Sequence, residues 1–355
     1  MRIHNINLHN FRNHGKYTCV FENDLTIIYG VNGAGKTNLL EAIYVLATSK
    51  SPRTKYDSDL IELKKNFATI TGVIDSNGDE YNLELQVLRS ELNPNLSVKK
   101  AKVNKVIKTI AYFCGVFNAV LFTPQDIDII TGSPGVRRRY LDLLLAQIDP
   151  NYKKSLSLYN KSLKQRNKLL EDIRKEGRGR DQIPFWDNII VQNGLILQSG
   201  RQKYINYINS RLSSLTEELD KKHKEAKIIY KENEISQDKL DKHLEIDIRA
   251  QTTLIGPHRD DFHVELGTFD VGQFGSRGQQ RTLLLCLKLL EIEYFEQERG
   301  QRPVLLLDDI FSELDSSHKN AVMEVIGKQQ TIITSAEDIR ELGLELSGTP
   351  HVIRL

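Results

Sequence analysis

The chain has 355 residues, of which 39% are hydrophobic and 27% are charged. This composition supports a large apolar core and excludes a disordered, collagen-like or disulfide-scaffold protein. The 49 basic and 47 acidic residues give a formal net charge of +2. That balance argues against a uniformly basic nucleic-acid coat, but it leaves room for a local basic face. A chain of this length usually divides its core, so we expect about two lobes.

The three cysteines lie far apart in the sequence, and none has C-x-x-C spacing: Cys19, Cys114 and Cys286. Their neighbours are apolar, so we expect reduced, buried, structural thiols in a cytoplasmic protein. The N-terminus has no apolar signal core, and the most apolar later run, residues 283–290, is interrupted by Lys288. The sequence therefore predicts neither export nor a membrane span.

The N-terminal part predicts mixed sheet and helix. Residues 3–8 and 17–21 have strand-like patterns, and residues 25–29 form an apolar strand that leads into a glycine-rich turn and a helix. Residues 68–74 and 81–88 alternate on either side of Ser-Asn-Gly-Asp, which predicts a β-hairpin.

The middle of the chain, from Arg137 to Lys224, has the pattern of long helices, with breaks near 149–150, near 177–179 and at Pro184. Residues 151–250 hold 21 basic and 15 acidic residues, a difference of 21 − 15 = +6. This excess is equally typical of a solvated helical face and of an anion-binding surface.

The C-terminal part returns to an α/β pattern. Its expected elements are, in order, a strand at 262–266, a glycine-rich turn at 272–278, a helix at about 279–297, an apolar strand at 304–307 and a βαβ-like segment ending at 331–334. We therefore predict an α/β fold in which residues 1–136 and 251–355 form one domain and residues 137–250 form an inserted helical lobe. No fixed-period repeat is present.

The segment from Gly30 to Thr37 fits the phosphate-loop pattern G-x-x-x-x-G-K-[ST]. Its glycines let backbone N–H groups turn toward phosphate oxygens, Lys36 brings a cation to the β- and γ-phosphates, and the Thr37 hydroxyl can bind Mg²⁺. We therefore predict an ATP and Mg²⁺ site. The residues expected to bind the nucleotide here are Gly30, Val31, Asn32, Gly33, Ala34, Gly35, Lys36, Thr37 and Asn38.

The apolar run at 304–307 ends in Asp308 and Asp309. A strand buried on both faces would bring Asp308 beside the phosphate loop, where it can hold Mg²⁺ through water. Asp309 then falls where a hydrolysing site needs a carboxylate to orient or deprotonate water. The alternative is a strand end followed by a solvated acidic turn.

The segment Phe-Gly-Ser-Arg-Gly-Gln-Gln at 274–280 resembles the signature motif of the ABC-type ATPases, and Ser276 stands 32 residues before Asp308, as in that superfamily. In those proteins the signature serine and its glycine cap the γ-phosphate held by the opposite subunit. The resemblance implies that Ser276, Gly278 and Gln279 contact nucleotide across a dimer, at a helix N-terminus suited to anions. Gly275 replaces the usual leucine and Arg277 replaces a glycine, which weakens an exporter-type reading. A plain helix cap is the alternative.

Three further positions resemble superfamily motifs. Residues 312–315 resemble the D-loop, which implies a role for Asp315 at the dimer interface. Gln125 resembles the Q-loop glutamine that senses the metal and the γ-phosphate, although a glutamine after proline is also an ordinary loop residue. The position of the switch histidine has no histidine; Thr334, Ser335 and Glu337 stand there.

Six blocks in order resemble the RecF family of bacterial DNA replication and repair proteins, ABC-type ATPases related to SMC heads. They are residues 8–13, 30–43, 133–142, 256–261, 275–281 and 307–315. The resemblance covers nearly the whole chain. It implies a weak, DNA-dependent ATPase that dimerises with ATP and binds DNA at single-strand gaps. It also implies cooperation with RecR and RecO, support for RecA loading, and a role in the SOS response.

An ATP site completed by a second subunit makes ATP stabilise the dimer and makes hydrolysis release it. Asp309 is shorter than the glutamate that many ABC-type ATPases carry at this position, so we expect slow turnover. The sequence hypothesis is therefore a timed clamp rather than a motor.

Two basic runs are candidates for sequence-independent phosphate contacts. They are Arg137, Arg138 and Arg139, and the lysines Lys99, Lys100, Lys102, Lys105 and Lys108. The alternative for each run is solubility or intramolecular ion pairs. For the block from Gly256 to Asp261 we expect a structural hydrogen-bonded turn rather than a metal site.

Rival classes make different demands on the sequence. A transporter subunit normally carries the signature leucine and the switch histidine. An SMC-type protein needs hundreds of heptad residues, whereas Lys36 and Asp308 are 272 residues apart with no sustained heptad pattern, so a long coiled coil is excluded. An ATP-dependent dimeric scaffold that binds a protein partner without binding DNA, or without hydrolysing ATP, stays open.

Overall fold

The computed structural model describes residues 1–90, 97–220, 225–312, 314–336 and 349–355. The chain divides into two compact units: a first lobe, Met1–Asp126 with Leu285–Leu355, and a second lobe, Ile127–Leu284. This division differs from the predicted boundaries at 136/137 and 250/251. The strands on either side of residue 250, Ala226–Lys231 and Asp261–Leu266, pair with each other. Helix Ile183–Asn209 packs on the first strand and helix Pro134–Ile148 on the second, which keeps these segments in one unit.

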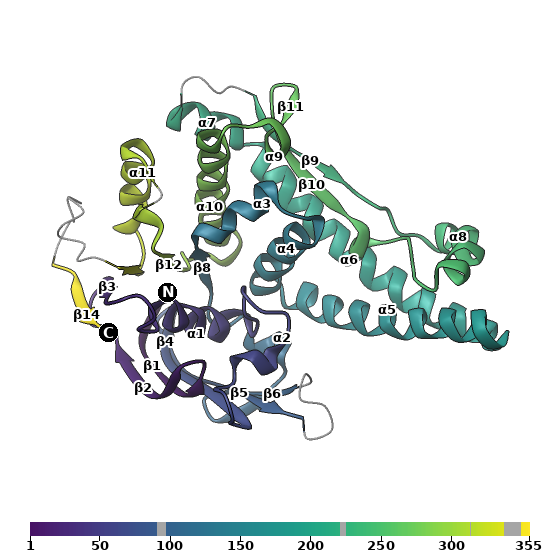
Figure 1. The fold of residues 1–355 in the computed structure, drawn as a ribbon, viewed down its shortest axis with the longest axis horizontal. Helices are drawn as coiled ribbons and strands as arrows, with labels where there is room; N and C mark the ends of the chain where they lie inside the picture. Colours follow the sequence, from purple (N-terminus) through teal and green to yellow (C-terminus); the bar gives the residue numbers. More distant parts are fainter. Residues whose placement is uncertain (91–96, 221–224, 313, 337–348) are drawn as a thin grey trace. The chain divides into compact units, whose positions relative to one another are not determined.

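The first lobe contains a five-stranded sheet with the order β14-β3-β13-β12-β8 (Figure 1), in which every pairing is parallel. Its strands are β3 (Leu25–Tyr29), β8 (Ala119–Phe122), β12 (Val304–Asp308), β13 (Thr331–Ser335) and β14 (His351–Arg354). All residues of β8, β12 and β13 are buried, as expected for aliphatic runs covered on both faces. The carboxyl ends of these parallel strands therefore meet at one edge.

Helices pack on this sheet and connect its strands. Helix α1 (Lys36–Thr48) follows β3 and packs on β8, β12 and β13. Helix α11 (Ser316–Ile326) lies between β12 and β13, and the short α2 (Ile110–Phe113) precedes β8. The long helix α10 (Arg277–Arg299) begins in the second lobe and ends in the first.

A second, antiparallel sheet of the first lobe has the order β2-β1-β4-β5-β6-β7. Its strands are β1 (Arg2–Phe11), β2 (His14–Val20), β4 (Phe67–Ser76), β5 (Asp79–Arg89), β6 (Ser97–Val103) and β7 (Val106–Lys108). The predicted hairpin is confirmed as β4–β5, and both turn residues, Asn77 and Gly78, have positive φ, as a two-residue turn of this twist requires. A Cβ on Gly72 would lie 2.8 Å from the Leu46 side chain, so α1 approaches this sheet closely.

The second lobe is mainly helical: α3 (Asp128–Thr131), α4 (Pro134–Ile148), α5 (Pro150–Glu176), α6 (Ile183–Asn209), α7 (Leu212–Leu219), α8 (Gln237–Ala250) and α9 (Val271–Phe274). The predicted breaks are confirmed. Asp149 caps α5 through the N–H of Asn151, Gly177 ends α5 with φ 71°, and Pro184 lies in the first turn of α6. Helices α5 and α6 pack along each other.

Two features of the second lobe differ from the sequence expectation. It contains a three-stranded sheet of β9 (Ala226–Lys231), β10 (Asp261–Leu266) and β11 (Phe269–Asp270), of which β9 falls within residues 137–250, the predicted helical lobe. The glycine-rich segment after β11 holds the short helix α9, because the Asp270 side chain accepts from the N–H of Gly272 and caps it.

Within the described residues, no helix is long and apolar enough to cross a membrane. The three cysteines are buried and free, as predicted.

Buried charges organise the second lobe. Asp260 accepts hydrogen bonds from Arg201, Tyr230, Gln198 and the Asn233 N–H. Elsewhere, the fully buried Arg166 pairs with Asp187 and Asp247, both at 2.6 Å. Such networks are costly when partly satisfied and specify one packing when complete. The 256–261 block thus forms the hydrogen-bonded turn expected from the sequence.

His258 is held inside this turn. Its Nε2 lies 2.9 Å from the Thr253 carbonyl, which accepts, so Nδ1 accepts from the Tyr159 hydroxyl at 2.7 Å. Burial lowers the pKa of His258 from 6.5 to about 4. The neutral ring is therefore the native form.

This assignment predicts a pH-dependent stability difference. Because the folded-state pKa lies below the unfolded one, the stability contributed by His258 is complete above pH 6.5 and falls as the pH drops toward 4, by about 2 kcal/mol at pH 5. His258→Gln should be less stable than the parent at pH 7.5, and the gap should narrow by about that amount at pH 5. Urea unfolding at both pH values tests this; a gap that does not change with pH contradicts the assignment.

Candidate nucleotide site

The phosphate loop connects β3 to α1 at the carboxyl edge of the parallel sheet. Gly33 and Gly35 have φ of 87° and 108°, a region that residues with a Cβ rarely adopt. A Cβ on Gly35 would also lie 2.7 Å from the ring of His14, so only glycine fits there. Burial lowers the pKa of His14, which keeps this ring neutral against the loop. The loop thus has the backbone form that the sequence motif predicts.

Lys36 and Thr37 open helix α1. The Lys36 ammonium donates to the carbonyls of Gly30 at 2.6 Å and Val31 at 3.1 Å, so the cation lies over the loop. The Thr37 hydroxyl donates to Asp308 Oδ1 at 3.0 Å. The first turn of α1 also supplies N–H groups that no helix carbonyl accepts, and this end of the helix attracts anions.

Asp308 is the last residue of β12 and accepts a hydrogen bond from a second hydroxyl group. Thr334, which ends the neighbouring strand β13, donates to the same Oδ1 at 2.6 Å. Thr334 is one of the three residues at the position where the superfamily carries its switch histidine. Carboxylate and hydroxyl oxygens are ligands that Mg²⁺ prefers, with phosphate and water oxygens completing its shell. The residues present therefore fit a magnesium ion.

Asp309 adopts a left-handed backbone with φ 52°, and its N–H donates to the Thr334 carbonyl at 3.1 Å. A non-glycine residue in this region is uncommon and is held there by its surroundings. The turn directs the chain away from the sheet immediately after Asp308. As a result, Asp309 is exposed at the mouth of the site.

These residues line one cavity of about 270 Å³: Asn32, Gly33, Gly35, Lys36, Thr37, Asn38, Arg53, Asp308, Asp309 and Thr334. The structure therefore brings the phosphate loop together with both aspartates and with one of the three residues at the switch position. Glu337, the third of those, lies outside the described residues, as does Glu313 of the D-loop-like segment.

Gln125 lies close in the fold but not in the cavity. It follows β8, whose carboxyl end is at the same edge as that of β12, but its side chain is exposed and does not line the cavity. The next residue, Asp126, accepts from the Thr123 N–H at 2.8 Å, and its other close partner is the Lys288 ammonium of α10 at 3.5 Å. This segment is therefore tied to α10.

The signature-like residues lie in the second lobe at the start of α10. Ser276 Oγ accepts from the Gln279 N–H at 3.2 Å, and Gln279 Oε1 accepts from the Ser276 N–H at 2.8 Å. This reciprocal pair is a capping box, so the helix-cap alternative describes their local contacts. Gly278 follows in the first turn. Asp315 caps α11 by accepting from the N–H of His318, which lowers the pKa of its carboxyl.

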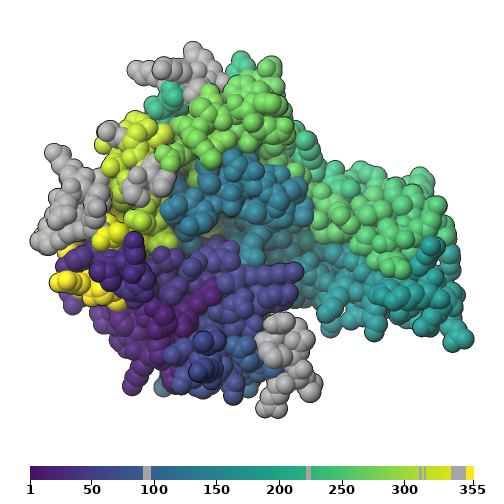
Figure 2. All heavy atoms as spheres, in the orientation of Figure 1, coloured from purple at the N-terminus to yellow at the C-terminus, as the bar shows by residue number. Residues whose placement is uncertain are grey.

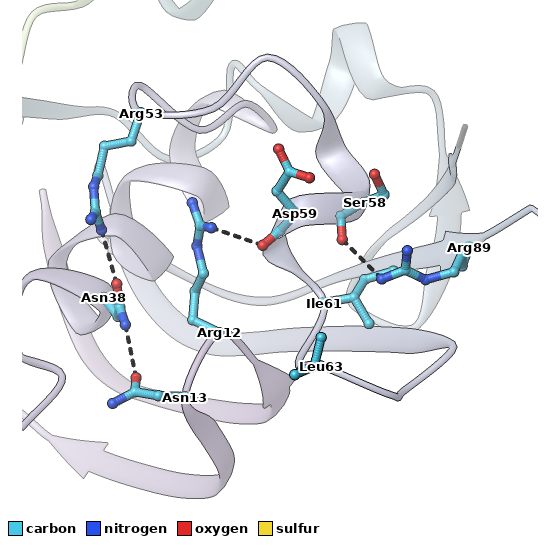
Figure 3. Close-up of a pocket in the computed structure, with 9 residues that line it drawn as sticks. All are labelled: Arg12, Asn13, Asn38, Arg53, Ser58, Asp59, Ile61, Leu63 and Arg89. Atoms are coloured by element: carbon cyan, nitrogen blue, oxygen red, sulfur yellow. Dashed lines mark hydrogen bonds between the residues drawn. The ribbon is translucent and has the colours of Figure 1, made fainter. Parts of the chain in front are cut away.

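A second cavity of about 620 Å³ adjoins the first and shares Asn38 and Arg53 with it (Figure 3). Its lining includes three arginines: Arg12, Arg53 and Arg89. Asn38 accepts from Arg53 at 2.9 Å and donates to Asn13 at 2.8 Å, as the figure shows.

Glu41, one helical turn after Thr37, fixes two of these arginines. Arg12 donates to it twice, at 2.9 and 2.7 Å, and Arg53 donates at 3.3 Å. The Ser51 hydroxyl also donates to Glu41. Glu41 is 1% exposed, so its charge is balanced by these partners. Sequence reasoning missed Arg12, Asn13 and Arg53 as site residues; the first two lie in a family-like block, and nothing in the sequence marks Arg53.

The residues predicted to contact DNA divide into paired and exposed groups. Arg137 is bidentate to Asp261 at 2.6 and 3.0 Å, and Arg138 donates to the Asp260 carbonyl. Arg139 is half-buried. For Arg137 and Arg138, the structure supports the alternative of intramolecular contacts.

The lysine run also contains both paired and exposed residues. Lys99 pairs with Asp57 at 2.8 Å, and Lys102 pairs with Glu84 at 2.7 Å. Burial raises the pKa of Asp57, but the ammonium groups of Lys99 and Lys50 outweigh it and lower the pKa overall. Lys100 and Lys105 are exposed on the β6–β7 hairpin.

Comparison with known proteins assigns the family. The family model described as RecF/RecN/SMC N terminal domain matches residues 2–341. The DNA replication and repair protein RecF of Agathobacter rectalis is 35% identical, over 94% of this chain and 92% of the relative. This chain belongs to the RecF family. RecF of Bacillus thuringiensis is likewise 35% identical, over 99% of this chain and 97% of its own.

Solved structures agree with this assignment. A structure of the recombination mediator protein RecF-ATPrS in the RecFOR pathway superposes with a TM-score of 0.85 at 33% identity, covering 98% of this chain and 94% of the other. The corresponding RecF-ATP structure gives 0.84 at 34% identity, covering 95% and 92%. An Smc head domain from Pyrococcus furiosus shares the fold alone, with a TM-score of 0.50 at 18% identity over 96% and 90%. The predicted ABC-type α/β fold is confirmed, and the longest described helices, α5 and α6, have 27 residues each.

The role of Glu41 can be tested by removing its charge. Glu41→Gln leaves Arg12 and Arg53 without a buried counter-ion, so we expect the free energy of unfolding to fall by about 3 kcal/mol. The matched control is Glu84→Gln, which breaks the half-buried pair with Lys102 near the surface and should change stability by less than about 1 kcal/mol. Urea unfolding of both variants measures the difference. Equal effects would show that Glu41 is not an organising charge.

Proposed function

We propose that this protein is an ATP-dependent DNA-binding protein of recombinational repair and replication restart. ATP drives a homodimer that closes on DNA at single-strand gaps, and slow ATP hydrolysis releases it. In this role it works with RecR and RecO, supports RecA loading and contributes to the SOS response. The observation that carries the proposal is the convergence of Thr37 and Thr334 on Asp308 beside the Lys36 loop. Membership of the RecF family supports the choice of pathway.

The first cavity would take the phosphates. The carbonyl contacts of Lys36 are replaceable by β- and γ-phosphate oxygens, which attract the ammonium more strongly because they are charged. Thr37 and Asp308 would hold Mg²⁺, whose charge would offset that of the phosphates. Gln125 would join them only after moving from its exposed position.

The adjoining cavity would take the rest of the nucleotide. It begins at Asn38 and Arg53, immediately beyond the phosphate loop, and its volume of about 620 Å³ lies within the range of small-molecule sites. The Glu41-held guanidinium groups of Arg12 and Arg53 provide fixed donors along this path. Binding therefore requires little ordering of side chains.

Asp309 is the proposed water-orienting carboxylate. Its exposed place at the mouth of the cavity leaves it open to solvent in the single chain. An efficient general base is held at a fixed distance from its water. We infer that hydrolysis is slow until a second subunit closes the site, which suits a timed clamp.

A second copy would supply Ser276 and Gly278. The first turn of α10 has N–H groups without helix acceptors, and its dipole favours an anion. The capping box keeps Ser276 and Gln279 at the surface in a fixed arrangement. Asp315 would lie at the same interface, as the family resemblance implies.

Two variants separate nucleotide binding from dimerisation. Lys36→Met removes the cation over the loop and should abolish ATP binding. Ser276→Arg places a bulky charge at the start of α10 and should leave ATP binding intact while blocking the dimer. Equilibrium nucleotide titration and sedimentation velocity with ATP measure the two steps. A normal ATP-induced dimer in the Ser276→Arg variant would contradict the proposed interface.

DNA binding is tested by fluorescence anisotropy of labelled gapped, duplex and single-stranded DNA with ATP, with ADP and without nucleotide. We expect ATP alone to tighten binding, and Lys36→Met to lose that gain. If no DNA binds under any nucleotide, the alternative stands, and the protein is an ATP-dependent dimeric scaffold for a protein partner.

A further inference from the structure

Helix α5 carries its lysines on one side. Six lysines lie along it: Lys153, Lys154, Lys161, Lys164, Lys168 and Lys175. At 100° per residue, all six fall within about 100° of arc. The buried residues of the helix, including Tyr152, Tyr159 and Arg166, fall on the opposite side. The helix therefore has one face packed into the second lobe and one basic face.

The basic face is not neutralised along most of its length. Between Pro150 and Leu170 the helix contains no aspartate or glutamate. Lys154, Lys161, Lys164 and Lys168 are all exposed, and none forms an ion pair with a described residue. Acidic residues occur only in the last two turns of this helix, where Lys175 pairs with Glu171. This contrasts with Lys99, Lys102 and Arg137, which are paired within the protein.

Helix α5 runs along an open edge of the second lobe, with α6 and α8 on its packed side (Figure 1). The space-filling view shows the same edge uncovered (Figure 2). From Lys154 to Lys168 the helix axis covers about 21 Å, and successive lysines seven residues apart are about 10.5 Å apart. This spacing is close to the major-groove width of about 12 Å, so the lysines can reach phosphates on both rims of a groove.

We propose that the lysine face of α5 binds the sugar-phosphate backbone of duplex DNA. This proposal rests on the proposed function and gives it a contact surface other than the two basic runs predicted from the sequence. Duplex DNA presents one negative charge per about 1.7 Å of its axis, which matches a rigid row of ammonium groups. The helix shows no stacking platform for single strands, because Tyr152 and Tyr159 are each 1% exposed. Contacts to the phosphate backbone carry no sequence information, so the binding is sequence-independent.

The test uses three matched triple variants of the full chain. Lys161, Lys164 and Lys168 are changed to Gln in the first variant and to Arg in the second. The third changes Lys100, Lys105 and Lys108 of the β6–β7 hairpin to Gln. Lys108 is half-buried beside the Tyr112 ring, and the other five positions are exposed. Glutamine and arginine are good helix formers at the α5 positions. Sedimentation velocity with ATP confirms that each variant still forms the proposed dimer.

Anisotropy with a labelled duplex, in ATP and over a salt series, gives the result. We expect the α5 glutamine variant to bind at least tenfold more weakly. The slope of log affinity against log salt should also become shallower by about 0.9 for each phosphate that the variant no longer neutralises. The arginine variant should retain both affinity and slope, because it retains the charges. The hairpin variant should change little.

Other outcomes overturn the proposal. An unchanged salt slope in the glutamine variant, or a weakening confined to the hairpin variant, places the DNA-binding surface elsewhere while leaving the proposed function intact. An equal weakening for single-stranded DNA contradicts a duplex-specific face. If the parent protein binds no DNA with any nucleotide, the proposed function fails and the α5 surface fails with it.

Discussion

The candidate nucleotide site is organised around one carboxylate oxygen. Asp308 Oδ1 accepts from Thr37, which opens α1, and from Thr334, which ends β13. Three segments that are far apart in the sequence are thereby fixed to one point. This is possible because β3, β12 and β13 are parallel neighbours, so their carboxyl ends meet at the same edge. The buried aliphatic residues fix the register of these strands, and that register places Asp308 Oδ1 beside Thr37 and Thr334.

Helix α1 connects the phosphate loop to the adjoining cavity. It starts with Lys36 and Thr37 and, one turn later, presents Glu41 to Arg12 and Arg53. A single helix therefore positions both the proposed phosphate-binding groups and the arginines of the adjoining cavity. The antiparallel sheet packs tightly on this helix, as the close approach of Gly72 in β4 to Leu46 shows. Disturbing the buried charge of Glu41 therefore affects the same helix that carries the loop.

The sequence predicted the features that depend on local pattern. The phosphate loop, the apolar strand before Asp308, the β4–β5 hairpin and the helix breaks at Asp149 and Gly177 all have signals within a few residues. It missed features that depend on contacts between distant segments. Strand β9 pairs with β10, which lies 30 to 40 residues further along the chain, and this pairing unites segments that the sequence prediction assigned to different domains. Arg53 is held at the cavity by Asn38 and Glu41, which lie 15 and 12 residues away, and no spacing rule predicts such contacts.

The basic residues show the same limit in physical terms. Consecutive residues on a helix point 100° apart, so Arg137, Arg138 and Arg139 cannot share one exposed face. Consecutive residues on a strand alternate, which turns Lys99 inward to Asp57 while Lys100 faces solvent. Lysines separated by three, four or seven residues collect on one side of a helix instead, as along α5. A run of consecutive basic residues therefore does not predict a charged surface, whereas basic residues at helical spacing do.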